Sequence, residues 1–211
     1  MDFILTPVEV RVLGCLIEKE VTTPEYYPLS VNALQNACNQ TSNRNPVVAY
    51  DETGVLRALE QLKVKGFVSS AHMGRVTKYE ERFLKRLNLV RQETAILCVL
   101  MLRGQQTVGE IRSRSERFHA FESLEDVLNT METLAGWGYV MLMPRQPGRK
   151  EARYAHLFSG PPLPEGNEEE VATPKSGSAE QVARLETAVD LLRQEVANLK
   201  QVVADFKAQF E

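Results

Sequence analysis

The sequence predicts a mainly α-helical fold with small β-hairpins, arranged as two tandem winged-helix domains followed by a C-terminal coiled-coil helix. Residues 51–82 have the pattern of an amphipathic helix that leads directly into a short hairpin. The same pattern returns over residues 123–158, and internal repeats of this kind identify repeated structural units. A third observation is a heptad pattern of Val and Leu over residues 179–211.

In the first copy of the pattern, Asp51 is expected to cap the helix and Gly66 to end it. Residues 67–71 and 76–80 then alternate as two strands around a glycine-containing turn. The expected buried stripe of the helix, the glycine and the start of the first strand are Val55, Leu56, Leu59, Leu62, Gly66, Phe67 and Val68. They are matched without an insertion by Val127, Leu128, Met131, Leu134, Gly138, Tyr139 and Val140.

The first predicted domain, residues 1–82, begins with a capping box from Thr6 to Glu9 and proline at the first helical position. Ser30 is expected to cap a second, short helix. Residues 39–46 follow as a long polar connection to the third helix. The second predicted domain, residues 83–158, has a helix over 93–102, a helix starting at Thr107, a helix over 124–135, and strands over 139–143 and 153–158.

Residues 159–178 are rich in Pro, Gly and Glu and are predicted to be a disordered acidic linker. The helix predicted over residues 179–211 would be about 50 Å long, and Val at one heptad position with Leu at the other favours a parallel dimer. Folding back of this helix on the chain's own domains is the alternative. The predicted dimerisation residues are Val182, Leu185, Val189, Leu192, Val196, Leu199, Val203, Phe206 and Phe210.

Composition indicates an ordinary cytoplasmic protein without a membrane span or a secretion signal. The three cysteines lack CxxC spacing, and Cys15 and Cys98 fall on apolar helix faces, whereas Cys38 is the one expected to be exposed. The three histidines lie far from one another and from any cysteine or paired carboxylate, so we expect no metal, no cofactor and no enzymatic activity. Trp137 and Tyr139 are expected to be core anchors.

Three stretches carry a resemblance to a known family. They are residues 5–19 (LTPVEVRVLGCLIEK), 27–34 (YPLSVNAL) and 45–51 (NPVVAYD). With them the chain resembles the bacterial YceH-like family of uncharacterised proteins through about residue 158. The resemblance implies a tandem winged-helix fold in a bacterial cytoplasmic protein, and it implies no activity and no functional residue.

The residues themselves favour a dimeric, regulator-like protein that binds double-stranded DNA. A winged helix reads bases with its third helix and contacts the backbone with its wing. Arg57 and Gln61 are one helical turn apart and are chemically suited to guanine and adenine edges. The DNA-contact candidates are Arg44, Thr53, Arg57, Gln61, Arg75, Lys78 and Arg82 in the first domain, and Arg145, Arg149, Lys150 and Arg153 in the second.

The alternative is a non-enzymatic adaptor that binds a protein partner. The third helix of the second domain carries Glu125 and Glu132 on its expected outward face, which would be repelled by DNA. The formal net charge is −3, and without the acidic C-terminal segment the remaining chain is only mildly basic. This charge permits DNA binding and does not require it.

Overall fold

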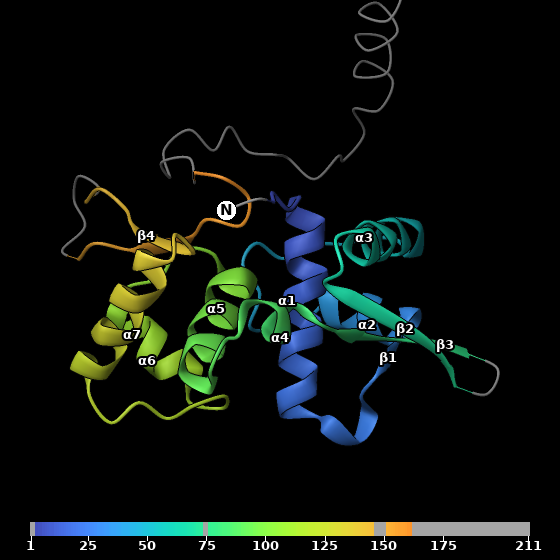
Figure 1. Ribbon diagram of the computed structural model, residues 1–211, viewed down its shortest axis with the longest axis horizontal. Helices are drawn as coiled ribbons and strands as arrows, with labels where there is room; N and C mark the ends of the chain where they lie inside the picture. Colours follow the sequence, from blue (N-terminus) through green and yellow to red (C-terminus); the bar gives the residue numbers. More distant parts are fainter. Residues whose placement is uncertain (1–2, 74–75, 146–150, 162–211) are drawn as a thin grey trace, which may run out of the picture. The chain divides into compact units, whose positions relative to one another are not determined.

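The computed structural model describes residues 3–73, 76–145 and 151–161, which all lie in one compact unit, Met1–Pro164. Over these residues the chain has seven α-helices and two small antiparallel sheets (Figure 1). No helix in this part of the chain is long and apolar enough to cross a membrane. We refer to residues 3–82 as the first half and to residues 83–161 as the second half.

The first half starts with three α-helices whose N-termini are capped as the sequence predicts. The side chains of Thr6, Ser30 and Asp51 each accept a hydrogen bond from the backbone N–H three residues later. The helical elements are α1 (Pro7–Thr22), a 3₁₀ turn (Pro24–Tyr26), α2 (Val31–Cys38) and α3 (Glu52–Val64). Residues 39–51 connect α2 to α3 without regular structure.

A three-stranded sheet completes the first half. It consists of β1 (Leu29–Ser30), β2 (Val68–Met73) and β3 (Val76–Glu81) in the order β1-β3-β2, all antiparallel. The hairpin β2–β3 confirms the predicted strands, whereas β1 has only two residues and no sequence pattern of its own. Leu29 of β1 lies opposite Tyr79, and both side chains are buried, which ties the chain before α2 to the hairpin.

The second half repeats this order on a smaller scale. It contains α4 (Phe83–Leu87), α5 (Arg91–Arg103), α6 (Val108–Ser115), α7 (Leu124–Gly136), β4 (Val140–Leu142) and β5 (Tyr154–His156). The strands β4 and β5 pair antiparallel, with Met141 opposite Ala155. The predicted helices and strands are therefore present, with boundaries shifted by at most two residues.

The predicted repeat of helix, glycine and strand is confirmed at the level of single hydrogen bonds. The helices α3 and α7 each have 13 residues, and Gly66 and Gly138 follow them with φ of 72° and 73°. The Phe67 N–H then donates to the Leu62 carbonyl at 2.9 Å, and the Tyr139 N–H donates to the Leu134 carbonyl at the same distance. A positive φ favours glycine, which explains why both copies carry it at this position.

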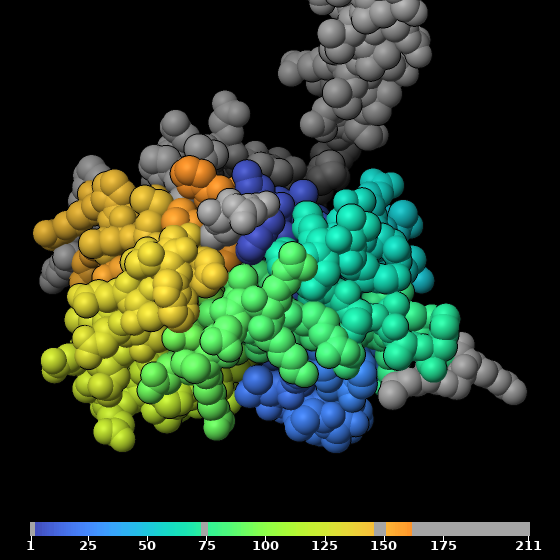
Figure 2. All heavy atoms as spheres, viewed as in Figure 1, coloured from blue at the N-terminus to red at the C-terminus, as the bar shows by residue number. Residues whose placement is uncertain are grey.

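The two halves pack on each other through α1 and α5, and their buried residues form one continuous core. Both helices are buried on nearly all sides, as expected of central helices. Gly14 allows their close approach, because a Cβ atom there would lie 3.0 Å from a methyl carbon of Leu102. On the face shown in Figure 2, the green residues of α4 and α5 lie between the first half (blue and teal) and the rest of the second half (yellow).

Several expectations about burial are wrong. Cys38 is fully buried rather than exposed, because the end of α2 packs against α1. Leu56 is only half-buried, and Leu128 is 39% exposed. Trp137 is 47% exposed and so is not a core anchor, although its ring contacts Tyr139 at a centroid distance of 5.8 Å. Most of the predicted linker and all the heptad residues from Val182 to Phe210 lie outside the described residues.

Candidate nucleic-acid interface

The helix α3 exposes the side chains that the sequence predicts for base contact. Thr53, Arg57 and Gln61 all lie on its solvent face, and Val64 at its end is 82% exposed. This orientation follows from the opposite face of the helix, which is buried. The buried residues are Val55, Ala58, Leu59 and Leu62.

The hairpin β2–β3 supplies the neighbouring positive charge at the same end of the molecule as α3 (Figure 1). Lys78 lies on β3 opposite Ala71, and its side chain is half-buried with no hydrogen-bond or ion-pair partner within the described part of the chain. Arg82 is exposed, but it pairs with Glu80 and donates to Ser69 Oγ at 2.9 Å. Arg75 lies outside the described residues.

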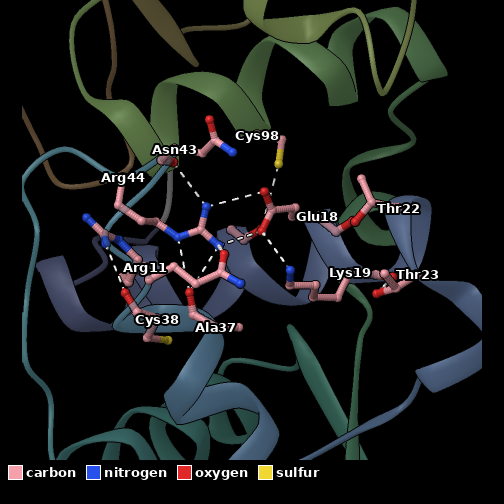
Figure 3. Close-up of polar contacts among 12 residues, drawn as sticks. Arg11, Glu18, Lys19, Thr22, Thr23, Ala37, Cys38, Asn43, Arg44 and Cys98 are labelled. Atoms are coloured by element: carbon pink, nitrogen blue, oxygen red, sulfur yellow. Dashed lines mark hydrogen bonds and ion pairs between the residues drawn. The ribbon is translucent and has the colours of Figure 1, made fainter.

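The structure contradicts the prediction that Arg44 contacts DNA. Its side chain is fully buried, with Nη2 lying 2.5 Å from Glu18 Oε2 (Figure 3). Its guanidinium also donates to the Ala37 carbonyl at 3.1 Å and to Gln40 Oε1 at 3.0 Å. Burial disfavours the charged form, but Glu18 outweighs this effect and holds the Arg44 pKa above its usual value.

Glu18 is the centre of a buried polar cluster that fixes the loop 39–51 before α3. Besides Arg44, it pairs with Lys19 at 3.7 Å and with Arg117 of the second half at 3.5 Å. Arg11 donates to the Pro46 carbonyl at 2.7 Å from the same side. Most residues of this polar loop are exposed, but Arg44 is buried and hydrogen bonds to α1 and to the second half hold the loop in place.

The end of α5 holds the same loop from the second half. The Asn45 N–H donates to the Leu102 carbonyl at 2.9 Å, and Arg103 donates to Asn43 Oδ1. Asn39 closes the other end of the loop, because its side chain donates to the Tyr50 carbonyl and accepts from the Tyr50 N–H, each at 2.8 Å. The entry into α3 is therefore defined by contacts from both halves.

The candidates in the second half are less available. Arg153 pairs with Glu110 at 2.9 Å and donates to the Gln105 carbonyl at 2.8 Å, so its charge is used inside the fold. Arg145 is exposed, while Arg149 and Lys150 lie outside the described residues. The sequence shows only that these residues are basic; the pairing of Arg153 with α6 depends on tertiary packing.

The helix α7 exposes a face of different character. Glu125 and Glu132 are exposed, as predicted for the adaptor alternative. Beside them Leu124 is 47% and Leu128 39% exposed. At the two positions that match Arg57 and Gln61 of α3, α7 carries Asn and Thr, so its exposed face has no counterpart of the Arg57 charge.

A carboxyl pair at the base of the hairpin has no signal in the sequence, because Glu20 and Glu81 are far apart in the chain. Burial and the nearby Glu81 raise the pKa of Glu20 to about 7. The Glu81 N–H donates to the Tyr27 hydroxyl oxygen at 2.6 Å, and Glu81 Oε2 accepts from the Leu84 N–H at 2.9 Å. Burial also raises the pKa of Tyr27. These groups link the end of α1 to β3 and α4.

No group of three or more His, Cys, Asp or Glu side chains in the described ranges is arranged to hold a metal ion. The His156 ring stacks on Phe158 at a centroid distance of 5.7 Å, and its Nδ1 atom is buried without a hydrogen-bond partner. Burial lowers the pKa of His156 to about 4. This histidine is part of the packing around β5.

Comparison with known proteins identifies the chain's relatives. Residues 5–149 match the family described as Protein of unknown function, DUF480. The chain is 51% identical over 219 residues to a UPF0502 protein of Pelobacter propionicus and 48% identical over 221 residues to one of Geobacter sulfurreducens, with 100% of both chains covered in each case. A UPF0502 protein of Solibacter usitatus is 47% identical over 212 residues with the same coverage. In agreement with the YceH-like resemblance, the chain belongs to this DUF480 family of bacterial proteins.

Proposed function

We propose that this chain is a DNA-binding protein of regulatory type, in which each half is a winged helix and the first half reads the duplex. The order of three helices and a hairpin, α1 to α3 with β2–β3 in the first half and α5 to α7 with β4–β5 in the second, supports the winged-helix interpretation. In such a fold the third helix enters the major groove and the hairpin lies along the backbone. For the first half these elements are α3 and β2–β3. The proposed role is binding without catalysis.

The observation that carries the proposal is the availability of Arg57 and Lys78. These two cations, on α3 and β3, have no hydrogen-bond or ion-pair partner among the described residues. By contrast, Lys63 pairs with Glu60, and most other cations among these residues form hydrogen bonds or ion pairs with oxygen atoms of the protein itself. Arg57 fits the two acceptors of guanine, and Gln61 one turn later fits adenine. Lys78 is the candidate for a phosphate contact.

Negative charge near α3 opposes DNA binding and restricts how the helix can be oriented on the duplex. Glu52 is exposed in the first turn of the helix and would repel phosphate. Glu60 is partly compensated because it lies 3.4 Å from Lys63. We therefore propose that α3 is oriented with Arg57 and Gln61 toward the bases and with Glu52 away from the nearest strand.

Dimerisation is the second part of the proposal. The Val and Leu heptads of residues 179–211 favour a two-stranded parallel coil, which would place two first halves on half-sites about 34 Å or a multiple apart. Light scattering of the full chain and of a chain ending at Ser178 measures this directly. The dimer proposal requires a dimer for the full chain and a monomer for the shortened one; two monomers would contradict it.

The DNA-binding proposal is tested by fluorescence anisotropy with labelled random and selected duplexes at low salt. We expect the full chain to bind and the double variant Arg57→Ala, Lys78→Ala to bind at least about tenfold more weakly, which corresponds to about 1.4 kcal/mol. Lys85→Ala removes one exposed charge on α4, outside α3 and the hairpin, and should leave the affinity nearly unchanged. Absence of binding at low salt would contradict the proposal.

The exposed face of α7 favours a second candidate function, that of an adaptor for a protein partner. Leu124 and Leu128 supply apolar contact area, and Glu125 and Glu132 would select a partner with basic residues around an apolar stripe. The variant Glu125→Lys, Glu132→Lys should lose such a partner in a pull-down while keeping its circular dichroism spectrum. Retention of the partner by this variant would contradict the adaptor function of α7.

A further inference from the structure

The loop 39–51 of the first half also caps the C-terminal end of α5 in the second half. The last carbonyl groups of a helix have no partner within the helix and need one from outside. The Asn45 N–H donates to the Leu102 carbonyl at 2.9 Å, and Asn45 Nδ2 donates to the Arg103 carbonyl at 3.4 Å. The loop that leads into α3 therefore satisfies the end of a helix that belongs to the other half.

Asn43 is the residue of this loop that both halves hold. Arg44 Nη1 donates to the Asn43 carbonyl at 3.0 Å, and Arg44 is itself paired with Glu18 in the buried polar cluster (Figure 3). From the second half, Arg103 Nη2 donates to Asn43 Oδ1. Asn43 has a φ of 61°, a left-handed conformation that asparagine and glycine both adopt. The amide oxygen that binds Arg103 is what asparagine adds to this position.

Polar contacts decide where this part of the loop lies. Residues 41–43 and 45–47 are exposed, so burial of apolar surface contributes little to holding them. The hydrogen bonds at the end of α5 therefore account for much of the order of this segment. The bond from Arg103 to Asn43 is the one in this set that joins the side chains of the two halves.

The start of α3 follows after a short, directly connected segment. Beyond residues 47–49, the Tyr50 N–H donates to Asn39 Oδ1 at 2.8 Å, and the Gly54 N–H donates to Asp51 Oδ1 at 2.8 Å. A displacement of Asn43 is passed along these few residues to the helix cap. The amides of Tyr50 and Gly54 are therefore reporters of how firmly the entry into α3 is held.

We propose that Arg103 is a positioning residue for α3: through Asn43, the second half sets the orientation in which Arg57 and Gln61 face the duplex. This inference rests on the proposed reading of DNA by α3, and it gives the second half a part in that reading without a DNA contact of its own. Loss of the bond should lower the population of the binding-competent arrangement, and the apparent affinity should fall by the same factor.

Arg103→Ala and Asn43→Gly remove the two ends of this bond. The second substitution leaves the charge unchanged and suits the left-handed backbone. We expect each variant of the full chain to bind a labelled duplex about three- to tenfold more weakly, the range that corresponds to one net hydrogen bond. The double variant should be no weaker than the weaker single variant, because both changes remove the same interaction. Arg103→Lys keeps a charged donor and should recover most of the affinity.

Arg112→Ala is the matched control. Arg112 is also an arginine of the second half that donates to backbone carbonyls, those of Phe121 at 3.3 Å and Glu122 at 2.8 Å, and both belong to its own half. Its loss removes the same charge and should leave the affinity nearly unchanged. Over a salt series, Arg103→Ala and Asn43→Gly should keep the wild-type slope, since neither removes a phosphate contact. A slope smaller by about 0.9 for Arg103→Ala alone would overturn the proposal, because Arg103 would then contact phosphate.

Amide hydrogen exchange of the free full chain measures the positioning without DNA. We expect faster exchange at Tyr50 and Gly54 in Arg103→Ala and Asn43→Gly, and wild-type exchange in Arg112→Ala. Wild-type exchange at these amides in Arg103→Ala, a uniform acceleration over the whole chain, or additive losses of affinity in the double variant would each overturn the proposal. If the two amides respond as expected and wild type binds no duplex, the proposed DNA-binding function fails while the positioning of α3 by Arg103 stands.

Discussion

Replacing Glu18 with glutamine tests the polar cluster that fixes the loop before α3. The Glu18 side chain is 4% exposed and that of Arg44 is fully buried, with 2.5 Å between the paired atoms. The substitution keeps the size of the side chain and removes its charge. Arg44 then remains in the core as a cation without a carboxylate.

The magnitude follows from what Arg44 retains. Breaking a buried ion pair by removing one partner costs about 3–5 kcal/mol. Arg44 keeps its hydrogen bonds to the Ala37 carbonyl and Gln40 Oε1, and the side-chain amide that replaces the carboxylate can still accept one more. We therefore expect a loss near the lower end, about 3 kcal/mol, which lowers the midpoint of thermal unfolding by about 6–12 °C for a chain of this size.

Urea titration at pH 7, followed by far-ultraviolet circular dichroism, measures the free energy of unfolding. The matched control is Glu60→Gln, which removes the same charge from the exposed pair that Glu60 forms with Lys63 at 3.4 Å. Such a pair contributes at most about 1 kcal/mol. Equal free energies of unfolding for Glu18→Gln and Glu60→Gln would refute the assignment of Glu18 as the centre of the cluster.

Three further predictions concern titrating groups and glycines. The pKa of Glu20 is raised from 4.5 to about 7, so the folded protein binds this proton more tightly than the unfolded chain and loses stability as the pH rises through this interval. Glu20→Gln should recover about 1–2 kcal/mol at pH 8, a value smaller than the full pKa shift because the side chain is partly exposed. The same substitution should not change the stability near pH 4. Equal effects at both pH values would contradict this. The pKa of His156 is lowered from 6.5 to about 4, so the folded protein binds this proton less tightly than the unfolded chain. The free energy of unfolding of wild type should therefore fall by up to about 3 kcal/mol as the pH falls from 6.5 to 4. In thermal unfolding at a series of pH values, His156→Leu should show a weaker dependence of stability on pH. Gly66→Ala should destabilise the fold by about 1–2 kcal/mol, because Gly66 has a φ of 72° and an added Cβ atom would contact Arg86. Gly109→Ala should stabilise it by up to about 1 kcal/mol, because Gly109 lies on α6 with open space around its Cα atom. Similar effects at the two positions would be inconsistent with the structure.

The sequence predicts the local part of this fold well, because helix caps, apolar periodicity and turn glycines act within a few residues. Asp51, Gly66 and Gly138 mark the ends of α3 and α7 correctly for this reason. The packing of α1 on α5 is not visible in the sequence, since an apolar helix does not show which surface covers it. Gly14 is the one local sign of this contact, and it is understood only with Leu102 beside it.

The same contrast between local features and tertiary contacts applies to the candidate nucleic-acid interface. The exposure of Thr53, Arg57 and Gln61 follows from the helical period, so the sequence is sufficient to place them. The partner of a charged side chain depends on tertiary contacts, and so Arg44 is misassigned to the surface and Arg153 is not recognised as an internal brace. Burial of Cys38 is missed because the end of a short helix appears polar in the sequence.

The salt dependence of duplex binding tests most directly whether α3 and the hairpin form a DNA-binding surface. Affinities of wild type, the double variant Arg57→Ala, Lys78→Ala, and Lys85→Ala are measured on one duplex over a salt series. We predict that the logarithm of the wild-type affinity falls linearly with the logarithm of salt concentration, that the slope of the double variant is smaller by about 0.9 for the lost phosphate contact, and that Lys85→Ala keeps the wild-type slope. Identical slopes for wild type and the double variant, or no binding by wild type at low salt, would contradict this assignment.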